Sequence, residues 1–413
     1  MVRVLLRSLS ALIVAGAAVL VGWRVLAPAE VLATVASPVP APSRAEPGVT
    51  GRTGVAPLIV DGRIRVYASR RQIRADAPLD AKTVYTAIWS LRRWPAQLSG
   101  VVAGGRLVIS HWSDGALIAI DGLTGKIAWR VAAGESAGYS GYRTGASAVW
   151  APRDLRLSGD SVLVTAGGRL SAYEVSTGTR RWVVSADCAS SFTTAGGQIV
   201  CRSAAYDVGT GAPVVGFPAG RYRPVGCGVA SSACAGLRDG DGRGWLTTGP
   251  APIRATTLDH QDSTVAAGVV FYPDGIGLRA IDAATGEVVR EYPAGAQVLG
   301  VTSGSRVPGE QKAGSGVPDE QKAGSAVPSE QAADGRVVLL TADRRLLVVE
   351  PRGGAIFAEF PLAYDSEKRN WDPGLWQVAD GYVAVERLAE CGPNNPDTPG
   401  YYFSAVPVII AAL

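Results

Sequence analysis

Histidine and cysteine are the side chains best suited to acid–base, nucleophilic and metal chemistry, and this chain of 413 residues contains few of either. Its only histidines, His111 and His260, are isolated in the sequence. Two isolated histidines give little from which to build a Ser-His-Asp triad or a metal centre. We therefore predict no catalytic residue and no metal ligand.

The five cysteines show no C-x-x-C spacing, which argues against a zinc site. Cys188 precedes a predicted strand and Cys201 lies in the next one, whereas Cys227 and Cys234 flank the short turn GVASSA. We predict the disulfides Cys188–Cys201 and Cys227–Cys234, with Cys391 free or paired to another molecule. The alternative is a set of five buried thiols.

The stretch RDGDGRGW, residues 238–245, places Asp239 and Asp241 close together. A calcium loop needs more carboxylates and a bidentate glutamate. We interpret this stretch as an acidic hairpin turn.

One pattern recurs along the chain and supplies the elements that would position any site. It begins as ALIAIDGLTGKIAWRV, Ala116–Val131: an apolar strand, an acidic residue, a Thr-Gly turn, and a second strand with a tryptophan. The further copies span Leu170–Val184, Ala204–Phe217, Leu237–Trp245, Leu278–Pro293 and Leu346–Pro361. Self-similarity at intervals of about 30 to 50 residues is typical of repeat architectures.

Each repeat, with the strands before it, has about four short strands and Gly-rich turns, which predicts a blade of a β-propeller. A parallel-strand solenoid would need shorter and more regular repeats. Six copies plus one blade closed by strands from both chain ends predict an all-β fold of seven blades, with eight as the alternative. The last blade would combine residues 376–413 with residues 58–69 or 83–91.

The turn of the repeat has a structural interpretation. We expect Asp121 and Thr124 to hold the turn, Gly125 to adopt a positive φ, and Trp129 to pack between blades. The corresponding residues of the other copies are Thr177, Gly178, Trp182, Thr210, Gly211, Thr285 and Gly286. Because the turn recurs, it is a poor candidate for a single cofactor loop.

The motif A-[ILY]-[DE]-x-x-T-G-x-x-x-W, best matched by residues 119–129 and 172–182, resembles the repeat of the PQQ-like β-propeller superfamily. That superfamily includes quinoprotein dehydrogenases and also BamB-type assembly factors, which bind no cofactor. The resemblance implies the fold over residues 85–413 and leaves the activity open.

The enzymatic branch of this superfamily holds calcium with a glutamate, an asparagine and a catalytic aspartate, and often has adjacent cysteines. Here no cysteines are adjacent, and the three asparagines, Asn370, Asn394 and Asn395, all lie outside the repeats. We therefore predict no cofactor.

The N-terminus has the pattern of an export signal. Arg3 and Arg7 precede the apolar run 9–23, and Arg24 follows it. We predict a signal anchor or transmembrane helix over residues 1–26, with cleavage and secretion as the alternative. Both place the rest of the chain outside the cytoplasm.

Two further segments have distinctive compositions. Residues 27–57 are rich in Pro, Ala and Ser, which predicts a linker before a propeller of residues 58–413. Within the propeller, the segment 303–335 contains a ten-residue repeat poor in large apolar residues, which predicts a disordered surface insertion.

Binding surfaces are expected in the loops rather than in the blades. The loop 138–150 contains Tyr139, Tyr142, Arg143 and Trp150, residue types suited to a partner surface. The alternative is a loop that plugs the channel or packs on a blade. A second candidate is the segment 365–376.

The formal net charge of +4 is spread without a basic run, which argues against nucleic-acid binding. We predict a monomeric, non-catalytic, membrane-anchored propeller outside the cytoplasm that binds a protein or cell-envelope partner. The alternatives are a quinone-dependent dehydrogenase and a sensor ectodomain.

Overall fold

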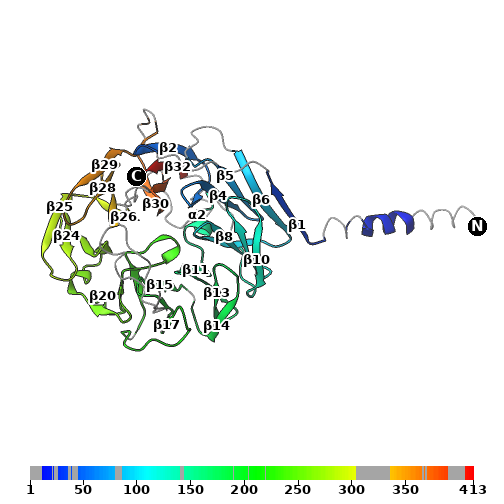
Figure 1. Cartoon of the computed structure of the whole chain (residues 1–413), viewed down its shortest axis with the longest axis horizontal. Coiled ribbons are helices and arrows are strands. Elements are labelled where there is room, and N and C mark those ends of the chain that lie inside the picture. The colour runs from blue at the N-terminus through cyan, green and yellow to red at the C-terminus, as the bar shows by residue number, and fades with distance from the viewer. Residues whose placement is uncertain are drawn as a thin grey trace, which may run out of the picture.

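Short antiparallel strands make up almost all of the regular structure (Figure 1). The computed structural model describes residues 12–20, 22, 27–35, 39, 45–79, 86–139, 144–188, 190–202, 204–218, 220–303, 335–364, 367, 370–388 and 405–413. The strands form eight sheets arranged as the blades of a ring, each blade starting with the strand nearest the axis.

The blades follow one another in chain order. Blade 1 contains β3 (Pro57–Val60), β4 (Ile64–Ser69), β5 (Gln72–Ala77) and β6 (Thr86–Trp94), and blade 2 contains β7 (Leu98–Gly104), β8 (Leu107–Trp112), β9 (Ala116–Asp121) and β10 (Ile127–Ala132). Blade 3 contains β11 (Leu155–Ser158), β12 (Ser161–Ala166), β13 (Arg169–Glu174) and β14 (Arg180–Ser185), and blade 4 contains β15 (Phe192–Thr193), β16 (Gln198–Val200) and β17 (Ala205–Asp207). Blade 5 contains β18 (Arg223–Val225), β19 (Gly236–Arg238), β20 (Gly244–Leu246) and β21 (Ile253–Arg254), and blade 6 contains β22 (Thr264–Ala266), β23 (Val269–Pro273), β24 (Gly277–Asp282) and β25 (Val288–Pro293). Blade 7 contains β26 (Gln297–Ser303), β27 (Gly335–Leu340), β28 (Arg345–Val349) and β29 (Ile356–Pro361), and blade 8 contains β30 (Asp372–Ala379), β31 (Tyr382–Leu388), β32 (Ala405–Ala412) and β2 (Gly48–Thr53).

The prediction of seven blades is therefore wrong: the propeller has eight. The six copies of the repeat, four of which contain the Thr-Gly turn, fall in blades 2 to 7, and blade 8 closes the ring as a separate sheet. The missed blade is blade 1. Its strands lack the motif, and the sequence prediction used residues 58–69 or 83–91 to complete the last blade, although residues 58–69 and 86–91 belong to blade 1 and residues 83–85 lie outside the described part of the chain.

The ring is closed by strands from both chain ends, but the N-terminal strand that closes it is not one of the two segments named in the prediction. The outer strand of blade 8 is β2, which pairs with β32 from Gly48↔Ala412 to Thr53↔Val408. Closure in this manner leaves no open sheet edge between the first and last blades. The range 27–57, expected as a linker, thus contains two strands, β2 and β1 (Ala29–Thr34).

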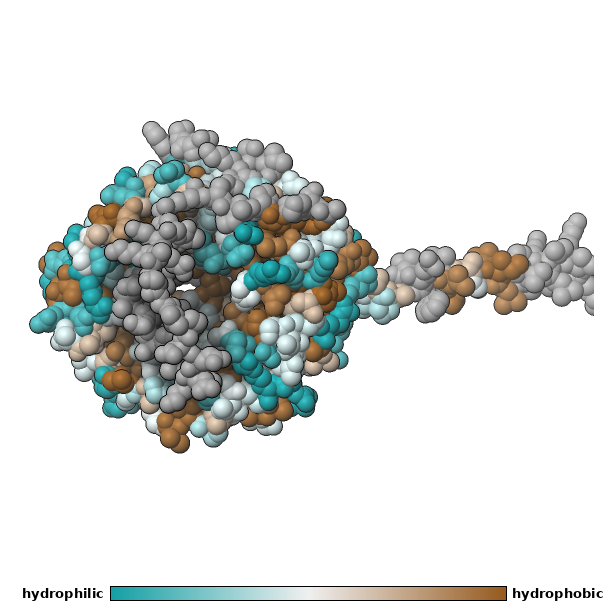
Figure 2. All heavy atoms as spheres, viewed as in Figure 1, coloured by the Kyte–Doolittle hydropathy of each residue, from teal (hydrophilic) through white to brown (hydrophobic). Residues whose placement is uncertain are grey.

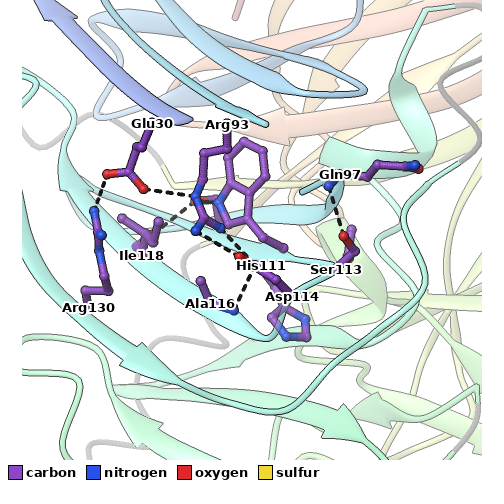
Figure 3. A network of polar contacts seen from close by, with 12 residues as sticks. Glu30, Arg93, Gln97, His111, Ser113, Asp114, Ala116, Ile118 and Arg130 are labelled. Atoms are coloured by element: carbon purple, nitrogen blue, oxygen red, sulfur yellow. Dashed lines mark hydrogen bonds and ion pairs between the residues drawn. The ribbon is translucent and has the colours of Figure 1, made fainter. Parts of the chain in front are cut away.

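Strand β1 pairs with β6 and makes blade 1 five-stranded. A charge network holds it there (Figure 3): Arg93, 14% exposed, donates through Nε to Glu30 at 2.9 Å and through Nη1 and Nη2 to both carboxylate oxygens of Asp114 at 2.9 Å. Glu30 also accepts from Arg130 of blade 2. The segment that follows the N-terminal helical residues 12–20 is thereby attached to the rim of blades 1 and 2.

Among the residues that the structure describes, no helix combines the length and the apolar character needed to cross a membrane.

The apolar core lies between the blades rather than within any one of them. Separate clusters of buried side chains join neighbouring blades, for example blades 2 and 3, blades 6 and 7, and blades 7 and 8. Because neighbouring blades pack face to face, these contacts hold the inner strands in place around the axis.

The predicted insertion falls between β26 and β27, whose register pairs Ser303 with Gly335. A two-residue Asn-Gly hairpin can therefore replace residues 304–334 without changing the ladder. We expect this shortened protein to melt at the same or a higher temperature, because each halving of a flexible loop lowers its closure cost by about 0.6 kcal/mol. A clear fall in the melting temperature, measured by calorimetry, would contradict the assignment of this segment as a surface insertion.

Candidate functional site

The turn residues of the repeat hold hairpins, as their backbone contacts show. Asp121 Oδ1 accepts from the N–H groups of Leu123 at 3.1 Å and Thr124 at 3.0 Å, and Gly125 has φ +70°. Asp207 likewise accepts from the N–H of Thr210 at 2.8 Å. A side-chain carboxylate that binds backbone N–H groups two and three residues later is an Asx-type turn, so these residues are used by the fold.

The tryptophan of the motif joins one blade to the next. Trp129 Nε1 in blade 2 donates to the carbonyl oxygen of Val175 in blade 3 at 2.8 Å. Its ring packs against Gly178, where an added Cβ would lie 2.6 Å from the indole. The same arrangement recurs for Trp89 with Gly122 and Gly125, and for Trp182 with Val208 and Gly211. At Gly286 the space is open, with no atom within 4 Å of an added Cβ.

Asp282 illustrates the electrostatics of these turns. The backbone N–H of Thr285, at 3.0 Å, together with Arg352, at 2.8 Å, and the N–H of Ala284, lowers the pKa of Asp282 to about 2. A lowered pKa stabilises the folded state above the ordinary pKa of 3.8, and this contribution is lost as the pH falls towards 2.

We therefore expect Asp282→Asn to lower the melting temperature at pH 7, where the charged carboxylate stabilises the turn. The gap between variant and wild type should narrow as the pH falls from about 5 to about 2, because the wild-type carboxylate becomes protonated. Thermal melts at a series of pH values measure this. A gap that does not change with pH would contradict the assignment.

The structure joins Cys188 to Cys201 and Cys227 to Cys234. Cys391 lies outside the described residues. Cys188 comes shortly after β14 of blade 3, and Cys201 comes directly after β16 of blade 4. The Cys227–Cys234 disulfide closes a loop in blade 5 that extends into the channel.

The loop closed by Cys227 and Cys234 has an unusual backbone. Three of its non-glycine residues have positive φ: Ala230 at 59°, Ser231 at 52° and Ala233 at 47°. A left-handed conformation costs such residues roughly 1–2 kcal/mol each. The N–H of Ala230 donates to the carbonyl oxygen of Trp150 at 2.8 Å, which connects this loop to the opposite side of the ring.

Trp150 follows the short helix α2 (Ala146–Val149), which lies near the axis (Figure 1). Its indole Nε1 donates to Pro57 O at 2.9 Å and Gln377 Oε1 at 3.2 Å. The Gln377 amide also bonds both backbone groups of Ile59, at 2.8 and 3.2 Å. The side chains of this network occupy the part of the channel that lies next to the inner strands of blades 1 and 8.

Of the four residues predicted as a partner surface, the structure describes Tyr139 and Trp150. Trp150 is 3% exposed, and Tyr139 is half-buried, with burial raising the pKa of its hydroxyl. Tyr142 and Arg143 lie outside the described residues. Trp150 instead has the alternative role, a plug of the channel, because its indole N–H finds two buried acceptors there.

A cavity of about 550 Å³ remains on the axis beside this plug. Its wall is formed by β18, β22, β26 and β30 together with the disulfide loop, and Figure 2 shows a hollow at the middle of the ring. Its large lining residues are apolar: Trp150, Val229, Val265, Val298, Leu299, Val301, Leu375, Trp376 and Val378. Val301 is 41% exposed.

No ionisable side chain lines this axial cavity in the part of the chain that the structure describes. Its side-chain polar groups are the hydroxyls of Ser231 and Thr264 and the indole N–H groups of Trp150 and Trp376, both of which donate to acceptors in the protein. Acid–base catalysis requires a titratable group within hydrogen-bond reach of the substrate.

Outside the axial cavity, the side chains best suited to catalysis or metal binding, such as His111 and Asp239, make hydrogen bonds within the fold. His111 is fully buried, its Nε2 lies 2.9 Å from Gly134 O, and burial lowers its pKa. Its Nδ1 lies 3.3 Å from Ser136 Oγ. Asp239 accepts from the indole N–H of Trp245 at 3.1 Å and from backbone N–H groups of its own turn. Within the described ranges, no group of three or more His, Cys, Asp or Glu side chains is placed to hold a metal ion.

Sequence reasoning missed the axial cavity. Its residues are small or apolar and come from four blades, so no local motif marks them. The only sequence signal was the closely spaced pair Cys227 and Cys234.

Comparison with known proteins gives one family match. Residues 86–195 match a family described as "Outer membrane protein assembly factor BamB". Similar solved structures include BamB from Moraxella catarrhalis, with 17% identity, 88% of this chain and 100% of that chain covered, and a TM-score of 0.37. A europium-containing methanol dehydrogenase has 13% identity, coverages of 90% and 93%, and a TM-score of 0.40. No curated protein sequence matches this chain significantly.

Proposed function

We propose that this chain is a member of the PQQ-like β-propeller superfamily and a non-catalytic propeller that binds a protein partner; the family match over residues 86–195 supports this assignment. The axial cavity carries the proposal. It is large enough for a few side chains, it is apolar, and it lies on a rigid scaffold, as binding sites do.

The occupant that fits best is an extended apolar segment of the partner. The inner strands β22, β26 and β30 each pair with a strand on one side only in the described sheets, and their other edges line the axial cavity. An extended peptide can hydrogen-bond to such an edge while its apolar side chains enter the cavity. Ser231 and Thr264 add hydroxyl groups for the peptide backbone.

We also propose that the propeller works outside the cytoplasm, attached through its N-terminal segment. The basic and apolar pattern of residues 1–26 supports export, and two disulfides suit an oxidising compartment. Fractionation of cells that express the full chain, with labelling of the exported domain by an impermeant reagent, tests this. Recovery of the unlabelled protein in the cytoplasmic fraction would contradict it.

A pair of matched variants tests the binding site. Val301→Asp places a carboxylate at the cavity wall, whereas Val183→Asp places one on the outer strand β14, where Val183 is 44% exposed. We expect the wild type and Val183→Asp to capture the same protein from an envelope extract, and Val301→Asp to capture several-fold less. Equal capture by all three would contradict binding at the axis.

A further inference from the structure

A second cavity, of about 480 Å³, lies off the axis between blades 7 and 8. It is formed by the β27–β28 turn, the segment after β29, the residues just before β30, and Arg387 on β31. We call it the inter-blade pocket. It shares no lining residue with the axial cavity.

Arg387 is the most unusual residue of the pocket. Its side chain is 1% exposed; Nε donates to Pro407 O at 2.8 Å, and Nη1 pairs with Glu367 Oε2 at 2.9 Å. Its Nη2 is buried and has no hydrogen-bond partner among the described residues. An unsatisfied buried donor of this kind costs about 1–3 kcal/mol, which an acceptor on a ligand would recover.

The rest of the described lining offers both hydrogen-bond donors and acceptors. Arg344 donates through Nε to Trp371 O at 2.7 Å and through Nη2 to Asp372 at 2.8 Å. The guanidinium carbons of Arg344 and Arg387 lie 5.2 and 5.8 Å from the Trp371 ring centroid. Asn370 and Asp343 are exposed at the wall and supply an amide and a carboxylate.

The charges of the lining select the ligand. Among the described residues that line the pocket, the two guanidinium groups of Arg344 and Arg387 are balanced by the two carboxylates of Asp343 and Glu367, so their summed formal charge is zero. An anion would meet arginines that already have carboxylate partners, and an apolar ligand would leave polar groups unsatisfied. A neutral ligand with many hydroxyl groups satisfies both kinds of group, since each hydroxyl donates and accepts.

We propose that the inter-blade pocket binds a neutral saccharide, with an oxygen of the sugar accepting from Arg387 Nη2. Its volume is within the range of small-ligand sites, about 300–1,000 Å³. The proposal goes beyond the protein-binding function and does not depend on it, because the two cavities are separate.

Calorimetric titration of the purified full chain tests the proposal, with N-acetylglucosamine and its β-1,4-linked disaccharide as neutral probes and sodium acetate and sodium phosphate as anionic ones. We expect saturable binding of a neutral probe at millimolar concentration or below, and none of the anions. Asn370→Ala and Arg344→Met should each weaken binding at least fivefold. Arg345→Met is the matched control, because Arg345 pairs with Glu359 outside the pocket and should leave binding unchanged.

Three results would overturn the proposal: no saturable binding of either sugar, sugar binding that both pocket variants leave unchanged, or saturable binding of acetate or phosphate but not of sugar. The pocket variants should capture the protein partner as the wild type does. A loss of sugar binding is therefore distinguishable from a loss of partner binding.

Discussion

Replacement of Gly178 by alanine should destabilise the propeller by about 3 kcal/mol, more than the same change at any turn glycine that faces open space. Gly178 has φ +72°, which costs an alanine roughly 1–2 kcal/mol. The added Cβ would also lie 2.6 Å from the ring of Trp129, and overpacking of this kind costs about 1–3 kcal/mol.

Gly286→Ala is the matched control. Gly286 has nearly the same backbone, with φ +74°, but no atom lies within 4 Å of an added Cβ. It should therefore cost only the backbone share of about 1 kcal/mol. Chemical unfolding of both variants, followed by tryptophan fluorescence, measures the difference. Equal destabilisation would show that the tryptophan contact between blades contributes nothing.

The second large effect concerns the two disulfides. Loss of Cys188–Cys201 should lower mainly the stability of the propeller, and loss of Cys227–Cys234 should lower mainly its affinity for the partner. Loss of Cys188–Cys201, through Cys188→Ala with Cys201→Ala, opens a loop of 13 residues and should cost about 3 kcal/mol of stability. Loss of Cys227–Cys234, through the corresponding alanine pair, opens a loop of 7 residues and should cost about 2 kcal/mol.

Partner affinity should respond in the opposite order. The Cys227–Cys234 loop holds three non-glycine residues at positive φ, of which Ser231 and Ala233 line the cavity, and without closure it can relax to other conformations. Because the apparent affinity falls with the fraction of molecules in the competent state, we expect a loss of tenfold or more. The Cys188–Cys201 variant should bind the partner normally below its melting temperature. Equal affinities for both variants would contradict a role of the disulfide loop in binding.

The repeat turns could be predicted from sequence because their chemistry is local. An aspartate, a glycine at positive φ and a tryptophan eight residues after the aspartate define a hairpin and its contact with the next blade, as Asp121, Gly125 and Trp129 show. The two disulfide pairs also followed from short spacings.

Features that depend on distant parts of the chain could not be predicted. Blade 1 lacks the motif, and the short polar strand Gly48–Thr53 is a strand only because β32 offers it an edge. Trp150 lies in a loop whose residue types are typical of a binding surface. It is nevertheless buried, because Pro57 and Gln377, 93 and 227 residues away, supply acceptors for its indole N–H. The inter-blade pocket likewise joins residues from separate turns around Arg387.

Site-specific photo-crosslinking tests the central claim, partner binding at the axis, most directly. Val301 at the cavity wall and Val183 on the outer rim, which are 41% and 44% exposed, would each be replaced by benzoylphenylalanine in the full chain. After irradiation in cells, we predict a discrete crosslinked protein from position 301, reduced by loss of Cys227–Cys234, and none of the same mass from position 183. A crosslink to that protein from position 183 alone would contradict binding in the axial cavity.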